Sequence, residues 1–154
     1  MGFGYSTIDL ATEIEQTGWS QKIETGVEVL DDQHRRYFSL VNDYLAVATK
    51  TAPYDNKLAE LVERLDFLRA YAVEHLATEQ EIMKDAEYPD YQRHLAEHEY
   101  FLMHVEELYE QTCNEGQSDK LTREVHYYTL EWFIRHIQFT DMKMVAFLKQ
   151  KSVL

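Results

Sequence analysis

Histidines and carboxylates stand at helical spacing within otherwise apolar stripes of this 154-residue chain. The segments HLATE, HLAEH and HIQFTD each place two such side chains four or five positions apart. Residues four positions apart lie on one face of a helix, about 6 Å apart along its axis, so both can reach the same part of the interior. With one further histidine, the residues of this pattern are His34, His75, Glu79, His94, His98, His136 and Asp141.

Burial of so many imidazoles and carboxylates needs compensation, because polar groups lose their hydration in an apolar interior. A lone histidine on an apolar stripe is more often a hydrogen-bonded core residue than a metal ligand. Seven such residues would need seven separate buried partners, which the stripes do not offer. Imidazole suits iron, zinc, copper and nickel, and two carboxylates can each bridge a pair of ions. The pattern therefore predicts a dinuclear metal protein.

Four long helical patterns follow one another between turn signals. The first is expected at about residues 30–50, because the residue before Pro53 is driven out of the α region. The second follows the N-cap candidates Asp55 and Asn56 and runs to about Ala86.

The third pattern has Pro89 in its first turn and ends near Gly116. Ser118 or Asp119 caps the fourth, which continues almost to the C-terminus. Short connections between long helices make neighbours antiparallel. We therefore expect an all-α fold, an up-down-up-down antiparallel four-helix bundle, in one domain over residues 19–154 with an N-terminal arm over residues 1–18.

The fourth helix carries an irregularity. Five residues separate His136 from Asp141, which places them about 140° apart on a regular α-helix. The apolar stripe resumes one residue late after Asp141, and without that shift Lys143 would face the core. The sequence therefore predicts a π-type turn, or an equivalent widening, between His136 and Asp141.

The spacing H…HxxxE…HxxxH…HxxxxD resembles that of the hemerythrin family, in its single-domain bacteriohemerythrin type. The resemblance extends over roughly residues 19–150 and includes GVEVLDDQHRRYF, AEYPDYQRHLAEHEYF and LEWFIRHIQFTD. It implies two iron ions per chain in a non-haem diiron centre with an oxo or hydroxo bridge. It also implies the ligands: one iron on His94, His98 and His136, the other on His34 and His75, with Glu79 and Asp141 bridging.

The resemblance implies reversible binding of molecular oxygen, for storage or for delivery to oxygen-requiring enzymes. The ligand types agree, because five neutral imidazoles and two anionic bridges favour ferrous iron over the high-valent states of carboxylate-rich oxidases. We therefore expect a non-enzyme with molecular oxygen as its partner and an oxygen-consuming enzyme as a possible recipient. The alternatives are an oxygen or redox sensor acting through a partner, and a diiron oxidase, peroxidase or nitric-oxide-handling enzyme.

The composition of the chain excludes several classes of binding partner and site. The formal net charge is −13, from 28 acidic and 15 basic residues, and no Lys/Arg cluster interrupts it. Nucleic acids and anionic membranes are therefore expected to be poor partners. The single cysteine, Cys113, excludes an internal disulfide and a thiolate cluster. The sequence shows neither a secretory signal nor a membrane span, which predicts a cytoplasmic protein.

Two aromatic residues and two further histidines share helical patterns with the predicted ligands. Tyr37 and Trp132 each stand one turn from a ligand histidine, so both should pack beside that layer. We expect the Tyr37 hydroxyl on the rim, the alternative being a hydrogen bond to something bound at the iron. His104 and His126 are turned away from the ligand faces of their helices and are expected to be peripheral.

Overall fold

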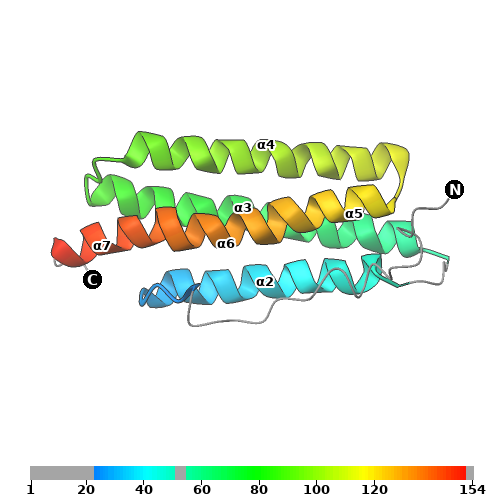
Figure 1. The fold of residues 1–154 in the computed structure, drawn as a ribbon, viewed down its shortest axis with the longest axis horizontal. Coiled ribbons are helices and arrows are strands. Elements are labelled where there is room, and N and C mark those ends of the chain that lie inside the picture. Colours follow the sequence, from blue (N-terminus) through cyan, green and yellow to red (C-terminus); the bar gives the residue numbers. More distant parts are fainter. Residues whose placement is uncertain (1–22, 51–54, 152–154) are drawn as a thin grey trace, which may run out of the picture.

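The computed structural model describes residues 23–50 and 55–151, and four helical rods lie side by side in this part of the chain (Figure 1). The first three are α2 (Glu28–Ala48), α3 (Lys57–Asp85) and α4 (Tyr91–Glu115). The fourth rod, yellow to red in Figure 1, consists of α5 (Asp119–His126), η2 (Tyr127–Trp132), α6 (Phe133–Arg135), η3 (His136–Asp141) and α7 (Met142–Gln150).

Rods that follow one another in sequence also pack side by side, and the fourth packs back against α2. The all-α up-down-up-down bundle is thus confirmed. The expected arm over residues 1–18 lies outside the described residues, as does Pro53. Among the described helices, none combines the length and apolar character needed to cross a membrane.

The expected helix ends are largely right, with two corrections. The Ser118 side chain accepts a hydrogen bond from the Leu121 amide, as expected of an N-cap. Gly116 directly follows the last residue of α4, with φ at +80°. Asn56 does precede α3, but its backbone is left-handed at φ +71° and its side chain makes no capping bond. Pro89 lies before α4 rather than in its first turn, because the helix begins two residues later.

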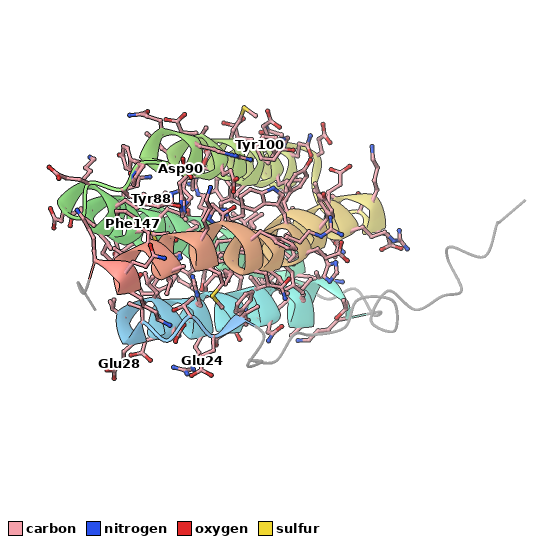
Figure 2. All side chains as sticks on the ribbon, turned by 60° about the vertical axis from the view of Figure 1, so that its left-hand side comes forward. Glu24, Glu28, Tyr88, Asp90, Tyr100 and Phe147 are labelled. Atoms are coloured by element: carbon pink, nitrogen blue, oxygen red, sulfur yellow. The ribbon has the colours of Figure 1, made fainter. Side chains whose placement is uncertain are left out.

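Two apolar clusters lie along the bundle. The larger one contains Tyr37, Phe101 and Phe133, and the smaller one contains Leu30 and Met83. Figure 2 shows Tyr88 of the smaller cluster and Phe147, which packs against that cluster, at one end of the bundle, where their ring centroids are 5.1 Å apart.

The polar residues of the sequence pattern fall between these clusters. On α2, for example, Leu30 of the smaller cluster and Tyr37 of the larger one stand on either side of His34. On the fourth rod, His136 and Asp141 come after Phe133 and before Met144. The polar layer is therefore closed off by apolar side chains in both directions along the bundle.

The predicted π-type turn is confirmed as η3, which runs from His136 to Asp141. Both end residues are buried, whereas Lys143 is exposed and pairs with Asp90. A second π segment, η2, was not predicted. Its Thr129 hydroxyl donates a 2.6 Å hydrogen bond to the Val125 carbonyl one turn earlier.

Tyr37 is completely buried, so its expected position on the rim is wrong. Its hydroxyl donates a 2.6 Å hydrogen bond to the Thr129 carbonyl of η2. A buried hydroxyl needs a hydrogen-bond partner, and this carbonyl supplies it. Burial raises the pKa of Tyr37 well above its usual value, so the hydroxyl stays protonated.

Tyr37→Phe removes the hydroxyl that donates this buried hydrogen bond, so the Thr129 carbonyl loses its side-chain partner. We expect the free energy of unfolding to fall by about 1–2 kcal/mol, measured by urea denaturation. Tyr127→Phe is the control, because Tyr127 is 40% exposed, and its effect should stay within about 0.5 kcal/mol. Equal unfolding midpoints for the two variants would contradict the role assigned to the bond.

Candidate metal centre

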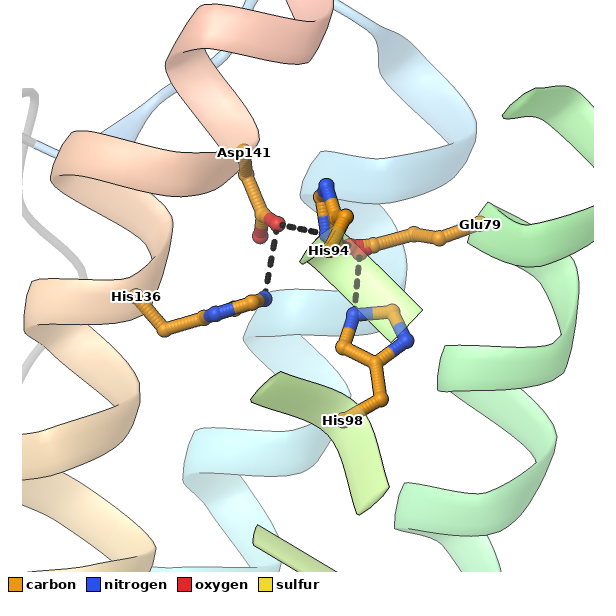
Figure 3. A group of neighbouring side chains, drawn as sticks. All are labelled: Glu79, His94, His98, His136 and Asp141. Atoms are coloured by element: carbon orange, nitrogen blue, oxygen red, sulfur yellow. Dashed lines mark ion pairs between the residues drawn. The ribbon is translucent and has the colours of Figure 1, made fainter. Parts of the chain in front are cut away.

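All four rods contribute side chains to the polar layer. Every one of the seven residues predicted from the sequence is at most 3% exposed. They are His34 on α2, His75 and Glu79 on α3, His94 and His98 on α4, and His136 and Asp141 at the two ends of η3. The predicted set therefore comes together in one place, and Figure 3 shows five of its members around a common point.

The seven residues form two groups whose potential ligand atoms lie within 4.8 Å of one another. One group contains three histidines, His94, His98 and His136, together with Glu79 and Asp141. The other contains His34, His75 and the same two carboxylates. We call these groups the three-histidine position and the two-histidine position.

Asp141 faces both positions. Its Oδ1 lies 3.0 Å from His136 Nε2 and 3.1 Å from His94 Nε2, both in the three-histidine position. Its Oδ2 lies 3.5 Å from His34 Nε2 in the two-histidine position. Each oxygen is thus placed for a different ion, which is the arrangement of a bridging carboxylate.

Glu79 is similarly placed between the positions. Its Oε2 lies 3.7 Å from His75 Nε2 and 3.9 Å from His98 Nε2, and its Oε1 lies 3.8 Å from His94 Nε2. Two ligand atoms that are each about 2 Å from one ion lie about 3–4 Å apart. The observed separations fit that requirement.

Missing hydrogen bonds provide an independent test of whether these residues suit metal ions. Among the residues that the structure describes, nearly all buried side-chain nitrogens and oxygens without a hydrogen-bond partner belong to the seven residues; the exception is Arg64 Nε. They include the Nε2 atom of every one of the five histidines and all four carboxylate oxygens. Because such atoms are costly to leave unpaired, the cluster fits cations that would accept their lone pairs.

In the protein without metal, three of the ligand histidines have pKa values that are shifted in opposite directions. Burial lowers the pKa of His75 to about 3 and that of His98 to about 2, with neighbouring histidines adding to the shift. Burial alone would also lower the pKa of His136, but Asp141 and Glu97 raise it to about 9. Burial and the nearby Asp141 raise the pKa of Glu79. His75 and His98 are thus held in the neutral form that binds metals.

The far sides of three ligand histidines meet side chains that the sequence reasoning missed. His75 Nδ1 donates to Gln33 Oε1 at 2.8 Å, and the Gln80 amide lies 3.4 Å from His98 Nδ1. His136 Nδ1 donates to Glu97 Oε2 at 2.8 Å.

These outer partners share a simple pattern. Gln33, Gln80 and Glu97 each directly precede or follow a ligand on their own helix, yet each contacts the histidine of the next rod. α2 thereby supports α3, α3 supports α4, and α4 supports the fourth rod. Adjacency to a ligand was a usable signal in the sequence, but spacing within one helix does not reveal a contact between helices.

Aromatic rings surround the histidines. Trp132 stacks on His136 with centroids 5.1 Å apart and an interplanar angle of 11°, as its predicted place beside the metal layer requires. Phe133 lies 6.0 Å from His34 and 5.9 Å from His75, between ring centroids. An open groove of about 570 Å³ between α4 and the fourth rod reaches Trp132, Glu97 and His136 from the surface.

His104 and His126 lie outside both metal positions. His104 stacks on Tyr128 with centroids 4.4 Å apart, and its Nδ1 is 3.6 Å from a Glu107 carboxylate oxygen. Its side chain is 22% exposed, which agrees with the peripheral position expected for it.

Comparison with known proteins agrees with this geometry. Residues 25–148 match the sequence model of the family described as Hemerythrin HHE cation binding domain. The chain therefore belongs to the hemerythrin family, and its buried cluster is consistent with iron binding.

Individual relatives cover most of the chain. A bacteriohemerythrin of Stenotrophomonas maltophilia is 30% identical over 123 residues, which are 80% of this chain and 75% of the relative. A bacteriohemerythrin of Clostridium acetobutylicum is 24% identical over 82% of this chain and 97% of the relative. A crystal structure of wild-type hemerythrin superposes with a TM-score of 0.73 and 26% identity, over 87% of this chain and 98% of that one.

The shifted pKa values predict how the metal-free protein depends on pH. The folded-state pKa values of His75 and His98 lie below the unfolded value of about 6.5, so their contribution is lost as pH falls from 6.5 toward 3. The raised pKa of His136 contributes stability below pH 6.5 that is lost as pH rises through about 9. Glu79, whose pKa is raised, opposes part of the acid loss, because the folded protein takes up its proton at a higher pH than the unfolded chain does.

We therefore expect the metal-free protein to be most stable near pH 6.5, measured by thermal unfolding in chelator from pH 4 to 10. Metal-loaded protein is the comparison, because ions held by the same atoms replace these protons. A metal-free profile that rises steadily from pH 6.5 to 9 would contradict the prediction.

Proposed function

We propose that this chain binds molecular oxygen reversibly at two iron ions and serves as an oxygen carrier or store rather than as an enzyme. The three-histidine position would hold one ion, the two-histidine position the other, and Glu79 and Asp141 would bridge them. Two ferrous ions, when bound, supply the chemistry of reversible oxygen binding. One observation carries the proposal: two buried groups share both carboxylates but differ by one histidine.

The difference of one histidine leaves the two positions with unequal numbers of protein ligands. The three-histidine position offers five ligand atoms, one from each residue, and the two-histidine position offers four. The latter has room for an additional small ligand. His34 and His75 are both completely buried there, next to the ring of Phe133, so a ligand at this position would be shielded from bulk water.

The Tyr37 hydroxyl, near the two-histidine position, is poorly suited to acid–base catalysis. Tyr37 stacks on Phe133 with centroids 4.0 Å apart, but its hydroxyl hydrogen is already donated to Thr129. Its raised pKa makes proton loss harder still. Tyr37 therefore offers no ready acid or base to a molecule held beside it, which supports binding without further reaction.

Delivery to an oxygen-consuming enzyme and residence in the cytoplasm belong to the same proposal. The formal net charge of −13 supports a soluble protein with little attraction to nucleic acids or anionic membranes. The alternatives are a sensor acting through a partner and an oxidase or peroxidase, and the experiments below separate them from a carrier.

The metal content is the first test. We expect two iron ions per chain in the wild type and a loss of the second ion in His75→Ala, because that variant leaves the two-histidine position with a single imidazole. Metal analysis after desalting measures both values. His126→Ala should retain two ions, and a His75→Ala variant that also retains two would rule out the assigned ligands.

Oxygen cycling is the second test. The anaerobic ferrous protein should gain a visible charge-transfer band on exposure to oxygen and lose it on degassing, over repeated cycles and without stoichiometric release of hydrogen peroxide. Visible absorption and a peroxide assay measure these outcomes. Immediate, irreversible decay of the band to a ferric form would overturn the carrier function in favour of a sensor or an oxidase.

A further inference from the structure

The outer hydrogen bonds of the five ligand histidines differ in charge. His136 Nδ1 donates to a carboxylate, Glu97 Oε2, whereas His75 Nδ1 donates at the same 2.8 Å distance to the neutral amide oxygen of Gln33. Among the described residues, Nδ1 of His34 and Nδ1 of His94 have no hydrogen-bond partner. In this part of the chain, the charged outer contact thus belongs to the three-histidine position.

The Glu97 carboxylate is itself held in place. Its Oε2 also accepts a 2.7 Å hydrogen bond from Thr140 Oγ1, so two donors of the fourth rod converge on one oxygen. The Glu97 side chain is 33% exposed, while that of His136 is 1% exposed and is covered by the Trp132 ring. In the neutral ring, which is the form that binds metal, the contact with Glu97 places the proton on Nδ1 and leaves the lone pair of Nε2 for an ion beside Asp141.

A carboxylate acceptor makes the imidazole a stronger metal ligand than a neutral amide does, because charge on the acceptor strengthens the hydrogen bond and raises the basicity of the ring. Loss of such an outer partner typically weakens metal binding about 10–100-fold. The two positions therefore differ in the charge that supports their histidines as well as in the number of histidines.

We propose that Glu97 is a positioning residue that makes the three-histidine position the tighter metal site, so that this position is loaded first. The inference rests on the two-ion site proposed above, but it does not depend on oxygen binding. It assigns a role to a residue outside the seven ligands and orders the assembly of the centre.

Cobalt(II) is a suitable probe, because it can be added to the metal-free full-length chain and followed by visible absorption. We expect two binding phases in the wild type. Glu97→Gln keeps a hydrogen-bond acceptor but removes the charge, so the tighter dissociation constant should increase about 10–100-fold while the weaker one is unchanged.

A second variant makes the opposite change at the two-histidine position. Gln33→Glu places a carboxylate behind His75. Thr78 Oγ1, which accepts from the present amide nitrogen at 3.2 Å, would have to turn its hydrogen from the Glu74 carbonyl to the new oxygen. This variant should tighten the weaker phase. The double variant Glu97→Gln/Gln33→Glu should therefore bring the two constants together or reverse their order.

A spectroscopic signature separates positioning from general stability. The Nδ1 proton of His136 should give a strongly shifted exchangeable proton resonance in the cobalt protein, and Glu97→Gln should move it and speed its exchange with water. Glu99→Gln is the matched control, because Glu99 is exposed on the same helix and loses the same charge. It should change neither the binding constants nor the resonance.

The possible failures are distinguishable. One cobalt ion per wild-type chain would overturn the two-ion site and the loading order together. Two ions with an unchanged tighter constant in Glu97→Gln would overturn the role of Glu97 alone. An equal weakening of both phases, without movement of the His136 resonance, would overturn it as well, since that result describes a general loss of stability.

Discussion

The bundle depends on the compensation of charge and polarity in a single buried layer. Five imidazoles and two carboxylates occupy positions where a helix bundle normally places apolar side chains, and they are buried between two apolar clusters. Without cations, burial and repulsion between like charges both disfavour the charged forms of these side chains. The lowered pKa of His98 and the raised pKa of Glu79 show this effect. Without metal, the layer that carries the proposed function contains buried polar atoms that have no hydrogen-bond partner, and these cost the fold stability.

The rest of the structure is arranged around this layer. The widened turn η3 lets His136 and Asp141 face the same interior although five positions separate them. Asp141 then spans both metal positions with its two oxygens. An uninterrupted α-helix would direct one of these side chains elsewhere, so the irregular backbone is part of the site rather than a defect next to it.

Much of this was predictable from the sequence, because side-chain spacing on a helix follows from the helix geometry alone. The bundle, the residues that converge and the widened turn at η3 all follow from that rule. What escaped prediction depends on contacts between rods: the burial of Tyr37 requires a carbonyl on η2, and Glu97 matters because His136 lies opposite it on another helix. Periodicity says which face of a helix is inward, but not which atom of another helix meets it.

The outer contacts run around the bundle in one direction, from α2 to α3, from α3 to α4, and from α4 to the fourth rod. No described contact of this kind runs from the fourth rod to α2, and His34 Nδ1 remains without a hydrogen-bond partner there. The series of outer hydrogen bonds is therefore interrupted between the fourth rod and α2. The orientation of His34 thus depends on packing against the rings of His75 and Phe133 and on the Asp141 carboxylate, so an ion in the two-histidine position would itself help to fix this ligand.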